Sequence, residues 1–212
     1  MRISDAVYTY DVTSTAYDEP FSVHVVEADD ATLLFGAGTD DTVDDVLRFV
    51  ETHGVDTVVV EHGHRDHYLG VPALRERTAI DVAIPERDAH MLDDVDVRPE
   101  YHLEHGDVLD GVRTVATPGH TPGNTSFVYD GTLIAGDTVV GSDSIYAANG
   151  YWGGALDVLA SDYNHDDAQA RRAVTRLLDD DVERVLVTHG SNVLDDGSRA
   201  LDDLAFALDR RE

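Results

Sequence analysis

The chain of 212 residues contains no cysteine and no lysine, and it has only two methionines and one tryptophan. Without cysteine, neither disulfide bonds nor thiolate ligands are available, so a metal site would have to use histidine and carboxylate side chains. No apolar segment is long enough to span a bilayer, and the first residues lack the apolar stretch of a signal peptide. A cytoplasmic protein, with a length that suits one domain, is therefore expected.

Basic residues are also scarce, because 15 arginines face 43 acidic residues and give a formal net charge of −28. A hydrophobic content of 42% argues against an acidic disordered chain. A folded protein with this surface suits molar salt, where the screening length falls to about 3 Å and repulsion between like charges is suppressed. The composition resembles that of haloarchaeal cytoplasmic proteins. It gives no support to nucleic-acid or membrane binding.

The apolar pattern predicts strands alternating with helices, which is typical of an α/β domain. The first three strands suggest an antiparallel meander. A helix over residues 42–52 is expected to be capped by Thr39 or Asp40 and to end at Gly54. The strands are expected at residues 6–12, 21–27, 31–35, 55–60, 80–84, 112–116, 126–129, 132–137 and 184–188. The other helices are expected at residues 68–74, 87–92, 167–178 and 198–208, with Asp166 or Asp167 capping the fourth.

A cluster of metal-ligand side chains follows the apolar run at residues 55–60. His62, His64, Asp66 and His67 lie within six residues of one another. Imidazole nitrogens and carboxylate oxygens are the usual ligands of zinc and related divalent metals. A single histidine would most often be structural, but four such side chains this close indicate a cation site.

Three further candidates stand in the second half of the chain, each just after an apolar strand. His120 lies in a loop fixed by two prolines and two glycines, Asp137 ends a predicted hairpin, and His189 follows the last strand. Side chains at strand ends can be aimed at one point, and seven ligands suit two metals that share a carboxylate. The remaining histidines lack this context and are expected to be structural or exposed: His24, His53, His90, His102, His105 and His165.

The order of these motifs resembles that of the metallo-β-lactamase superfamily over nearly the whole chain. Residues 62–67 match its HxHxDH signature, and residues 118–123, 136–137 and 188–190 match its downstream motifs. The resemblance implies an αββα sandwich with a metal centre along one edge. It also implies that His62, His64 and His120 hold one divalent ion, that Asp66, His67 and His189 hold the other, and that Asp137 bridges them. Zinc is the expected metal, with iron or manganese as alternatives.

Three positions depart from the usual family pattern. Gly36 stands where members often carry Asp, Glu61 stands where Thr often precedes the first motif histidine, and Leu69 replaces the first of two glycines. None removes a ligand. Glu61 and Gly36 are expected to alter the hydrogen bonds behind the ligands, and with them the affinity for metal or the choice of metal.

The expected activity is hydrolysis of a small-molecule thioester, lactone or ester by metal-activated water, with Asp66 accepting or passing on a proton. The glycine- and aromatic-rich residues 142–154 would form part of the substrate pocket. Tyr146 or Tyr151 would donate to the substrate carbonyl, unless these rings simply pack on the core. An iron-dependent sulfur dioxygenase is the main alternative, followed by a nuclease and then by a binding module without activity. The sequence leaves the oligomeric state open.

Overall fold

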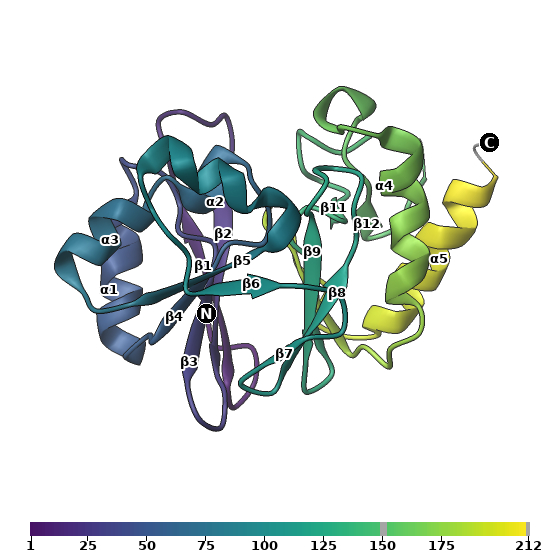
Figure 1. Ribbon diagram of the computed structural model, residues 1–212. Helices are drawn as coiled ribbons and strands as arrows, with labels where there is room; N and C mark the ends of the chain where they lie inside the picture. Colours follow the sequence, from purple (N-terminus) through teal and green to yellow (C-terminus); the bar gives the residue numbers. More distant parts are fainter. Residues whose placement is uncertain (149–151, 211–212) are drawn as a thin grey trace.

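The computed structural model describes residues 1–148 and 152–210 of the chain. Two β-sheets lie face to face, with helices on the outer side of each, as Figure 1 shows. The predicted αββα sandwich is therefore confirmed. None of the described helices is both long enough and apolar enough to span a membrane.

The first sheet contains six strands in sequence order. Its first three strands form the antiparallel meander that the sequence predicts, and the next three run parallel to their neighbours. The strands are β1 (Val7–Val12), β2 (Phe21–Glu27), β3 (Thr32–Phe35), β4 (Thr57–Val59), β5 (Asp81–Pro85) and β6 (Tyr101–Leu103).

The second sheet has the order β13-β10-β9-β8-β7, in which β13 alone runs parallel to its neighbour. A separate two-stranded ribbon follows Asp137 in the chain. The strands are β7 (Val108–Leu109), β8 (Val112–Ala116), β9 (Thr125–Tyr129), β10 (Thr132–Ile134), β11 (Val140–Gly141), β12 (Leu156–Asp157) and β13 (Arg184–Leu186).

The helices divide between the two outer faces. Those of the first half are α1 (Val43–His53), α2 (Arg65–Tyr68) and α3 (Val71–Arg77), and those of the second half are α4 (Asp167–Ala173) and α5 (Gly197–Asp209). Short 3-10 helices cover Glu86–Val95, Ser161–Tyr163 and Val174–Leu177.

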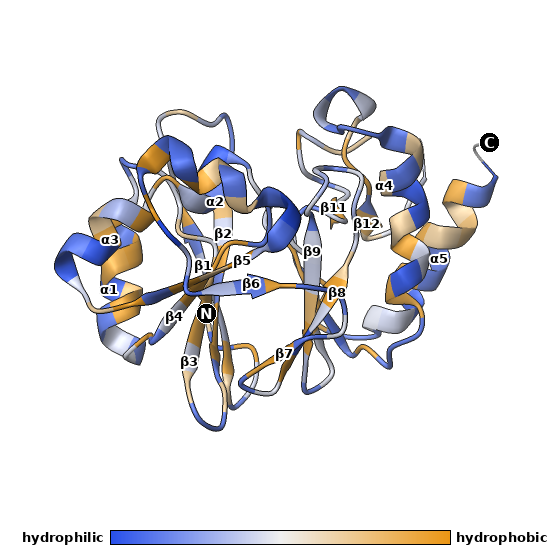
Figure 2. Ribbon diagram, viewed as in Figure 1, coloured by the Kyte–Doolittle hydropathy of each residue, from blue (hydrophilic) through white to orange (hydrophobic). Residues whose placement is uncertain are grey.

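Three apolar layers hold the sandwich together. Leu34 and Val58 face α1 and α3 on one side, whereas Leu33 and Phe35 face the second sheet, because successive side chains of a strand point to opposite faces. Phe35 meets Phe127 of β9 with ring centroids 5.0 Å apart. Figure 2 shows the same order, with apolar residues along the strands and on the helix faces turned toward the sheets.

Several predicted elements are corrected. The helix expected at 68–74 is two helices, α2 and α3, and the segment 87–92 belongs to a 3-10 helix. The segment expected as one helix from 167 to 178 changes to 3-10 geometry at Val174, although Asp166 caps its start as expected. Neither Thr39 nor Asp40 caps α1, because Thr39 donates its N–H to the Thr42 hydroxyl in a turn that delays the start of the helix. Gly54 ends α1 in the left-handed conformation as predicted.

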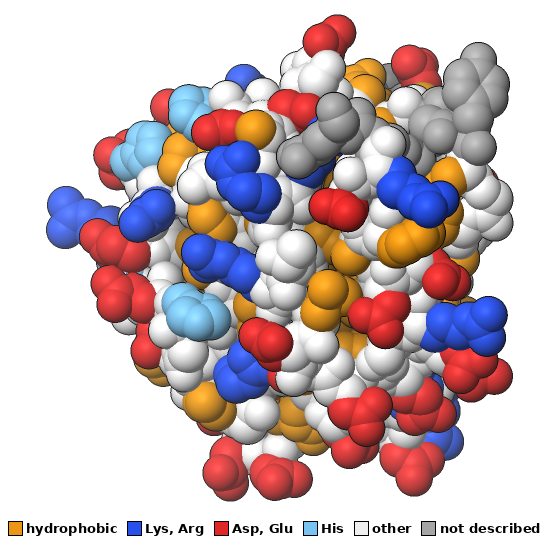
Figure 3. All heavy atoms as spheres, turned by 90° about the vertical axis from the view of Figure 1, so that its right-hand side faces the viewer, with side chains coloured by type: hydrophobic (Ala, Val, Ile, Leu, Met, Phe, Trp, Pro, Cys, Tyr) orange, Lys and Arg blue, Asp and Glu red, His pale blue; other side chains and the backbone are white. Residues whose placement is uncertain are grey.

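The acidic surface is interspersed with arginine. Figure 3 shows carboxylates and guanidinium groups side by side on the face that carries α4 and α5. Ion pairs of the described residues include Arg171 with Asp167 on α4 and Arg113 with Asp180. Among the described residues the buried acids are few, and four of the five lie around the predicted metal centre: Glu61, Asp66, Asp88, Asp137 and, elsewhere, Asp157.

A buried histidine outside the predicted centre makes stability depend on pH. Burial lowers the pKa of His24, in β2, to about 3. The unfolded chain therefore binds a proton below its ordinary pKa near 6.5 that the folded chain does not bind, so stability is lost as pH falls from 6.5 toward 3. Between pH 6.5 and pH 4.5, the free energy of unfolding measured with urea should fall by roughly 2–3 kcal/mol more for wild type than for His24→Leu. Equal pH dependence of the two proteins would show that His24 does not carry this effect.

Candidate metal centre

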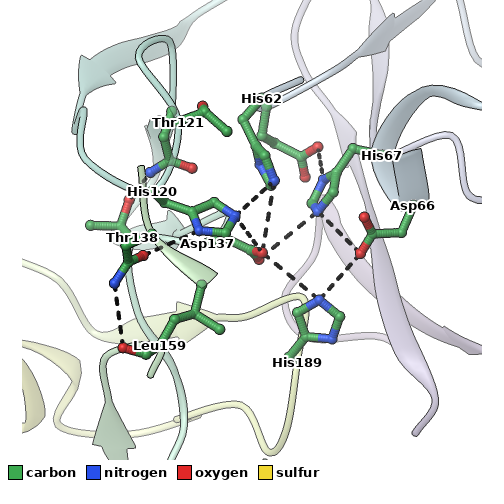
Figure 4. A network of polar contacts seen from close by, with 12 residues as sticks. His62, Asp66, His67, His120, Thr121, Asp137, Thr138, Leu159 and His189 are labelled. Atoms are coloured by element: carbon green, nitrogen blue, oxygen red, sulfur yellow. Dashed lines mark hydrogen bonds and ion pairs between the residues drawn. The ribbon is translucent and has the colours of Figure 1, made fainter. Parts of the chain in front are cut away.

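The seven predicted ligands meet at one edge of the sandwich. His62 and His64 follow β4, Asp66 and His67 lie on α2, and the remaining three follow β8, β10 and β13: His120, Asp137 and His189. All are buried except His64, which is half-buried. Figure 4 shows six of them pointing at a common point from both halves of the fold.

The ligand atoms form two groups that could each hold a metal ion. His62, His64, His120 and Asp137 make the first group, and Asp66, His67 and His189 make the second. Within the first group His120 Nε2 lies 3.2 Å from both His62 Nε2 and Asp137 Oδ2. Within the second, Asp66 Oδ2 lies 3.3 Å from His189 Nε2 and 3.8 Å from His67 Nε2.

These separations fit coordination of a cation. Ligand atoms about 2.0 Å from a tetrahedral ion lie roughly 3.3 Å from one another. Among the described residues, His67 Nε2 and Asp137 Oδ1 are buried without a hydrogen-bond partner, an arrangement that is costly unless another group satisfies them. Asp137 lies between the two groups, because Oδ2 is 3.8 Å from His189 Nε2 and Oδ1 is 3.9 Å from His67 Nε2.

The electrostatics of the site favour positive charge. Burial opposes a charge on His67, but the Glu61, Asp66 and Asp137 carboxylates outweigh it and raise the pKa of His67 to about 10. Burial likewise opposes a charge on Asp137, yet the surrounding imidazoles hold its pKa well below the usual range. A field that stabilises a proton between these groups also stabilises a metal cation there.

The loops that carry His120 and Asp137 are joined by a buried hydroxyl network. Thr138, which follows Asp137, contacts Thr117 at 2.6 Å and Ser126 at 2.8 Å, and Asn124 donates to it at 2.9 Å. In the same loop Gly119 has φ of +142°, and a Cβ there would lie 2.1 Å from the backbone nitrogen of Ala170. Glycine is therefore required for the loop to approach α4.

Asp88 joins the two histidine loops and is a residue that the sequence reasoning missed. Its buried carboxylate accepts from the backbone N–H of Gly63 at 2.8 Å, from that of Gly123 at 2.7 Å, and from the Thr121 hydroxyl. Gly63 lies between His62 and His64, and Thr121 and Gly123 follow shortly after His120. One carboxylate thus fixes the spacing of the first ligand group.

A cavity of about 250 Å³ opens onto both ligand groups. Besides the ligands, its wall contains Tyr17, Tyr146, Tyr163, Leu159 and Arg65. The predicted pocket residue Tyr146 is thus present, with its ring 4.9 Å from that of His189. Tyr151 lies outside the described residues. A larger cleft of about 570 Å³ beside Arg87 and Pro118 touches none of the predicted ligands.

Tyr17 is a second residue that the sequence reasoning missed, because the polar loop between β1 and β2 gave no signal. Burial together with the nearby Asp66 carboxylate holds the pKa of Tyr17 well above its usual range. In the same loop Glu19 accepts from the Ser144 hydroxyl and from the backbone of Ile145. This contact places Tyr17 and Tyr146 on the same cavity.

The family comparison agrees with this fold and these residues. Residues 18–189 match the model of the metallo-beta-lactamase superfamily, and the chain belongs to that superfamily. The matched region contains all seven predicted ligands.

Curated relatives with similar sequences include hydroxyacylglutathione hydrolases. The protein from Methylobacillus flagellatus is 30% identical over 105 residues, which is 46% of this chain and 40% of the relative. The protein from Cereibacter sphaeroides is 33% identical over 126 residues, which is 52% of this chain and 48% of the relative. This chain therefore covers less than half the length of these relatives. An uncharacterised protein of Bacillus subtilis, YobT, is 25% identical over 65% of this chain and 70% of its own length.

Solved structures show the same fold at low identity. The DIM-1 metallo-beta-lactamase superimposes with a TM-score of 0.77 at 17% identity and covers 100% of this chain and 96% of its own. The metallo-beta-lactamase from Pontibacter korlensis gives a TM-score of 0.73 at 19% identity, covering 99% of this chain and 97% of its own.

Proposed function

We propose that the protein is a dinuclear metal-dependent hydrolase of small-molecule thioesters, lactones or esters. The observation that carries the proposal is the pair of ligand groups, with Asp137 between them, lining one cavity. The partial matches to hydroxyacylglutathione hydrolases support an acyl substrate. The proposed metal is zinc. The acidic composition supports the further proposal that the protein works in concentrated salt.

The proposed metal ligands are the seven side chains described above. Divalent cations held there would supply a water activated at neutral pH and positive charge opposite the substrate carbonyl. Asp66 would remain unprotonated, since imidazoles beside it outweigh burial and lower its pKa, so it can accept a proton from the attacking water. Tyr17, whose pKa the neighbouring Asp66 carboxylate raises, would keep its proton and help to hold that carboxylate in place.

Tyr146 is proposed as the donor to the carbonyl oxygen of the substrate. Burial raises the pKa of Tyr146, so its hydroxyl keeps its proton at neutral and mildly alkaline pH. Tyr146→Phe should lower kcat about tenfold or more, because a donor to the developing oxyanion is lost. The matched control is Tyr163→Phe, a ring on the same cavity that stands edge-on to Tyr146. Equal steady-state kinetics of the two variants would contradict a special role for Tyr146.

The activity itself is tested on protein loaded with zinc in concentrated potassium chloride. We expect turnover of at least one member of a panel of thioesters, lactones and aryl esters, and loss of that turnover on chelation. A single bound iron per chain, with thiol-dependent oxygen uptake and no hydrolysis, would replace the proposal with a sulfur dioxygenase.

A further inference from the structure

Two departures from the family pattern lie against each other behind the second ligand group. Gly36 follows β3 and Glu61 follows β4, and these are neighbouring parallel strands. A Cβ built on Gly36 would lie 3.8 Å from both carboxylate oxygens of Glu61. An aspartate at position 36, the residue that the family pattern favours there, would therefore direct a carboxylate toward the space that the Glu61 carboxylate now fills.

The space around Glu61 is shaped for a long side chain. On its other side, a Cβ on Gly136 would lie 3.3 Å from Glu61 Cβ. Glycines at 36 and 136 thus leave room that larger residues would fill. The Glu61 side chain is almost completely buried, with 1% of its surface exposed. A carboxylate this deeply buried needs a specific partner to offset its desolvation.

That partner is His67. Glu61 Oε2 lies 2.8 Å from His67 Nδ1, and both side chains are 1% exposed. A hydrogen bond from Nδ1–H fixes the ring and leaves Nε2, the atom that faces Asp66 and Asp137, free to bind a cation. In the first ligand group, His120 Nδ1 faces a neutral partner instead, Asn164 Oδ1 at 3.3 Å.

We infer that Glu61 is a positioning residue for His67, and that it supplies from position 61 the carboxylate that an aspartate at position 36 would otherwise supply. This inference rests on the proposed metal centre. It accounts for the two departures occurring in one chain, because an aspartate at position 36 would set a second carboxylate against that of Glu61.

Three variants separate charge, hydrogen bonding and position. Glu61→Gln keeps the shape and can still accept from Nδ1–H but loses the charge. Glu61→Thr removes the contact with His67. The double variant Glu61→Thr with Gly36→Asp returns a carboxylate from the opposite side. Gly36 has φ of +81°, and the chain already holds aspartate at positive φ at four positions: Asp96, Asp110, Asp130 and Asp196.

A matched control exists far from the centre. Glu27 pairs with His53 in the same way, with Oε1 2.7 Å from Nδ1, and His53 is not among the predicted ligands. Glu27→Gln therefore removes the charge from a carboxylate–imidazole pair of the same contact geometry, although Glu27 is 39% exposed, without touching the site.

The measurement is a zinc titration against a chromophoric chelator, with thermal unfolding of each apo-protein as the check on folding. We expect Glu61→Gln to weaken one of two zinc sites by roughly 10–100-fold and Glu61→Thr at least as much, with the other site changed little. The double variant should recover most of the lost affinity, and Glu27→Gln should bind as wild type does.

Wild-type affinity at both sites in Glu61→Gln and Glu61→Thr would overturn the inference. A folded double variant that binds no better than Glu61→Thr would overturn the exchange with position 36; if it does not fold, the two single variants decide. If the protein hydrolyses none of the substrates but its zinc affinity depends on Glu61 in this way, the proposed activity is wrong and the inference about Glu61 stands. A wild-type chain that takes up no zinc would overturn both.

Discussion

Asp137→Ala should abolish hydrolysis and lower the metal content while the fold survives. Asp137 places one carboxylate oxygen 3.2 Å from His120 Nε2 and the other 3.9 Å from His67 Nε2, so its removal affects both ligand groups. The loss of hydrolytic activity should exceed the roughly 10–100-fold loss that is typical when a residue hydrogen-bonded to a metal ligand is removed. The fold should persist, because Asp137 lies after the end of β10 rather than within the apolar layers.

This prediction is checked by kinetics, zinc analysis and thermal unfolding on the same preparation. Asp143→Asn is a suitable control: that carboxylate lies six residues after Asp137, beyond β11, and accepts two bonds from Ser191, which is not a predicted ligand. Unchanged activity of Asp137→Ala would refute the assignment of Asp137 to the centre.

Asp88→Asn should destabilise the protein by about 2–4 kcal/mol and reduce zinc uptake by the first ligand group. An amide can accept at only one of its two ends, so at least one of the donors from Gly63, Thr121 and Gly123 would lose its bond. The two histidine loops would then no longer be held at a fixed spacing. Urea unfolding and the zinc titration measure the two effects.

The control for Asp88 is an exposed carboxylate that accepts at least as many hydrogen bonds. Asp41 accepts from Ser14, Thr15 and Thr39 in the turn before α1 and is exposed. Asp41→Asn should cost less stability, because water can replace the lost bonds, and should leave zinc binding unchanged. If Asp88→Asn matches wild type in both stability and zinc affinity, Asp88 does not fix the spacing of the loops.

The sequence predicted the scaffold of the centre well because the signals were local. Strands β2 and β8 have the predicted bounds, and Gly54 ends α1 as expected, since alternation and a left-handed glycine are read from a few residues. Each of the seven candidate ligands follows an apolar strand, and the fold brings those strand ends to one edge.

The parts that the sequence did not predict depend on burial and on contacts between distant segments. Asp88 is one of 43 acidic residues, and only its burial and its hydrogen bonds to the two histidine loops mark it out. Tyr17 reaches Asp66 across 49 positions in the chain, from a polar loop without periodicity. Gly36 and Glu61 stand 25 positions apart in the sequence, and their proximity exists only once β3 and β4 pair.

The central claim is that two cations occupy this centre. The most direct test is elemental analysis of metal per chain, on protein purified without chelator in concentrated potassium chloride. We predict two zinc ions per chain in the wild-type protein and fewer in Asp137→Ala. A chain without metal that takes up none on reconstitution would contradict the account, because its ligand groups would then not be metal sites.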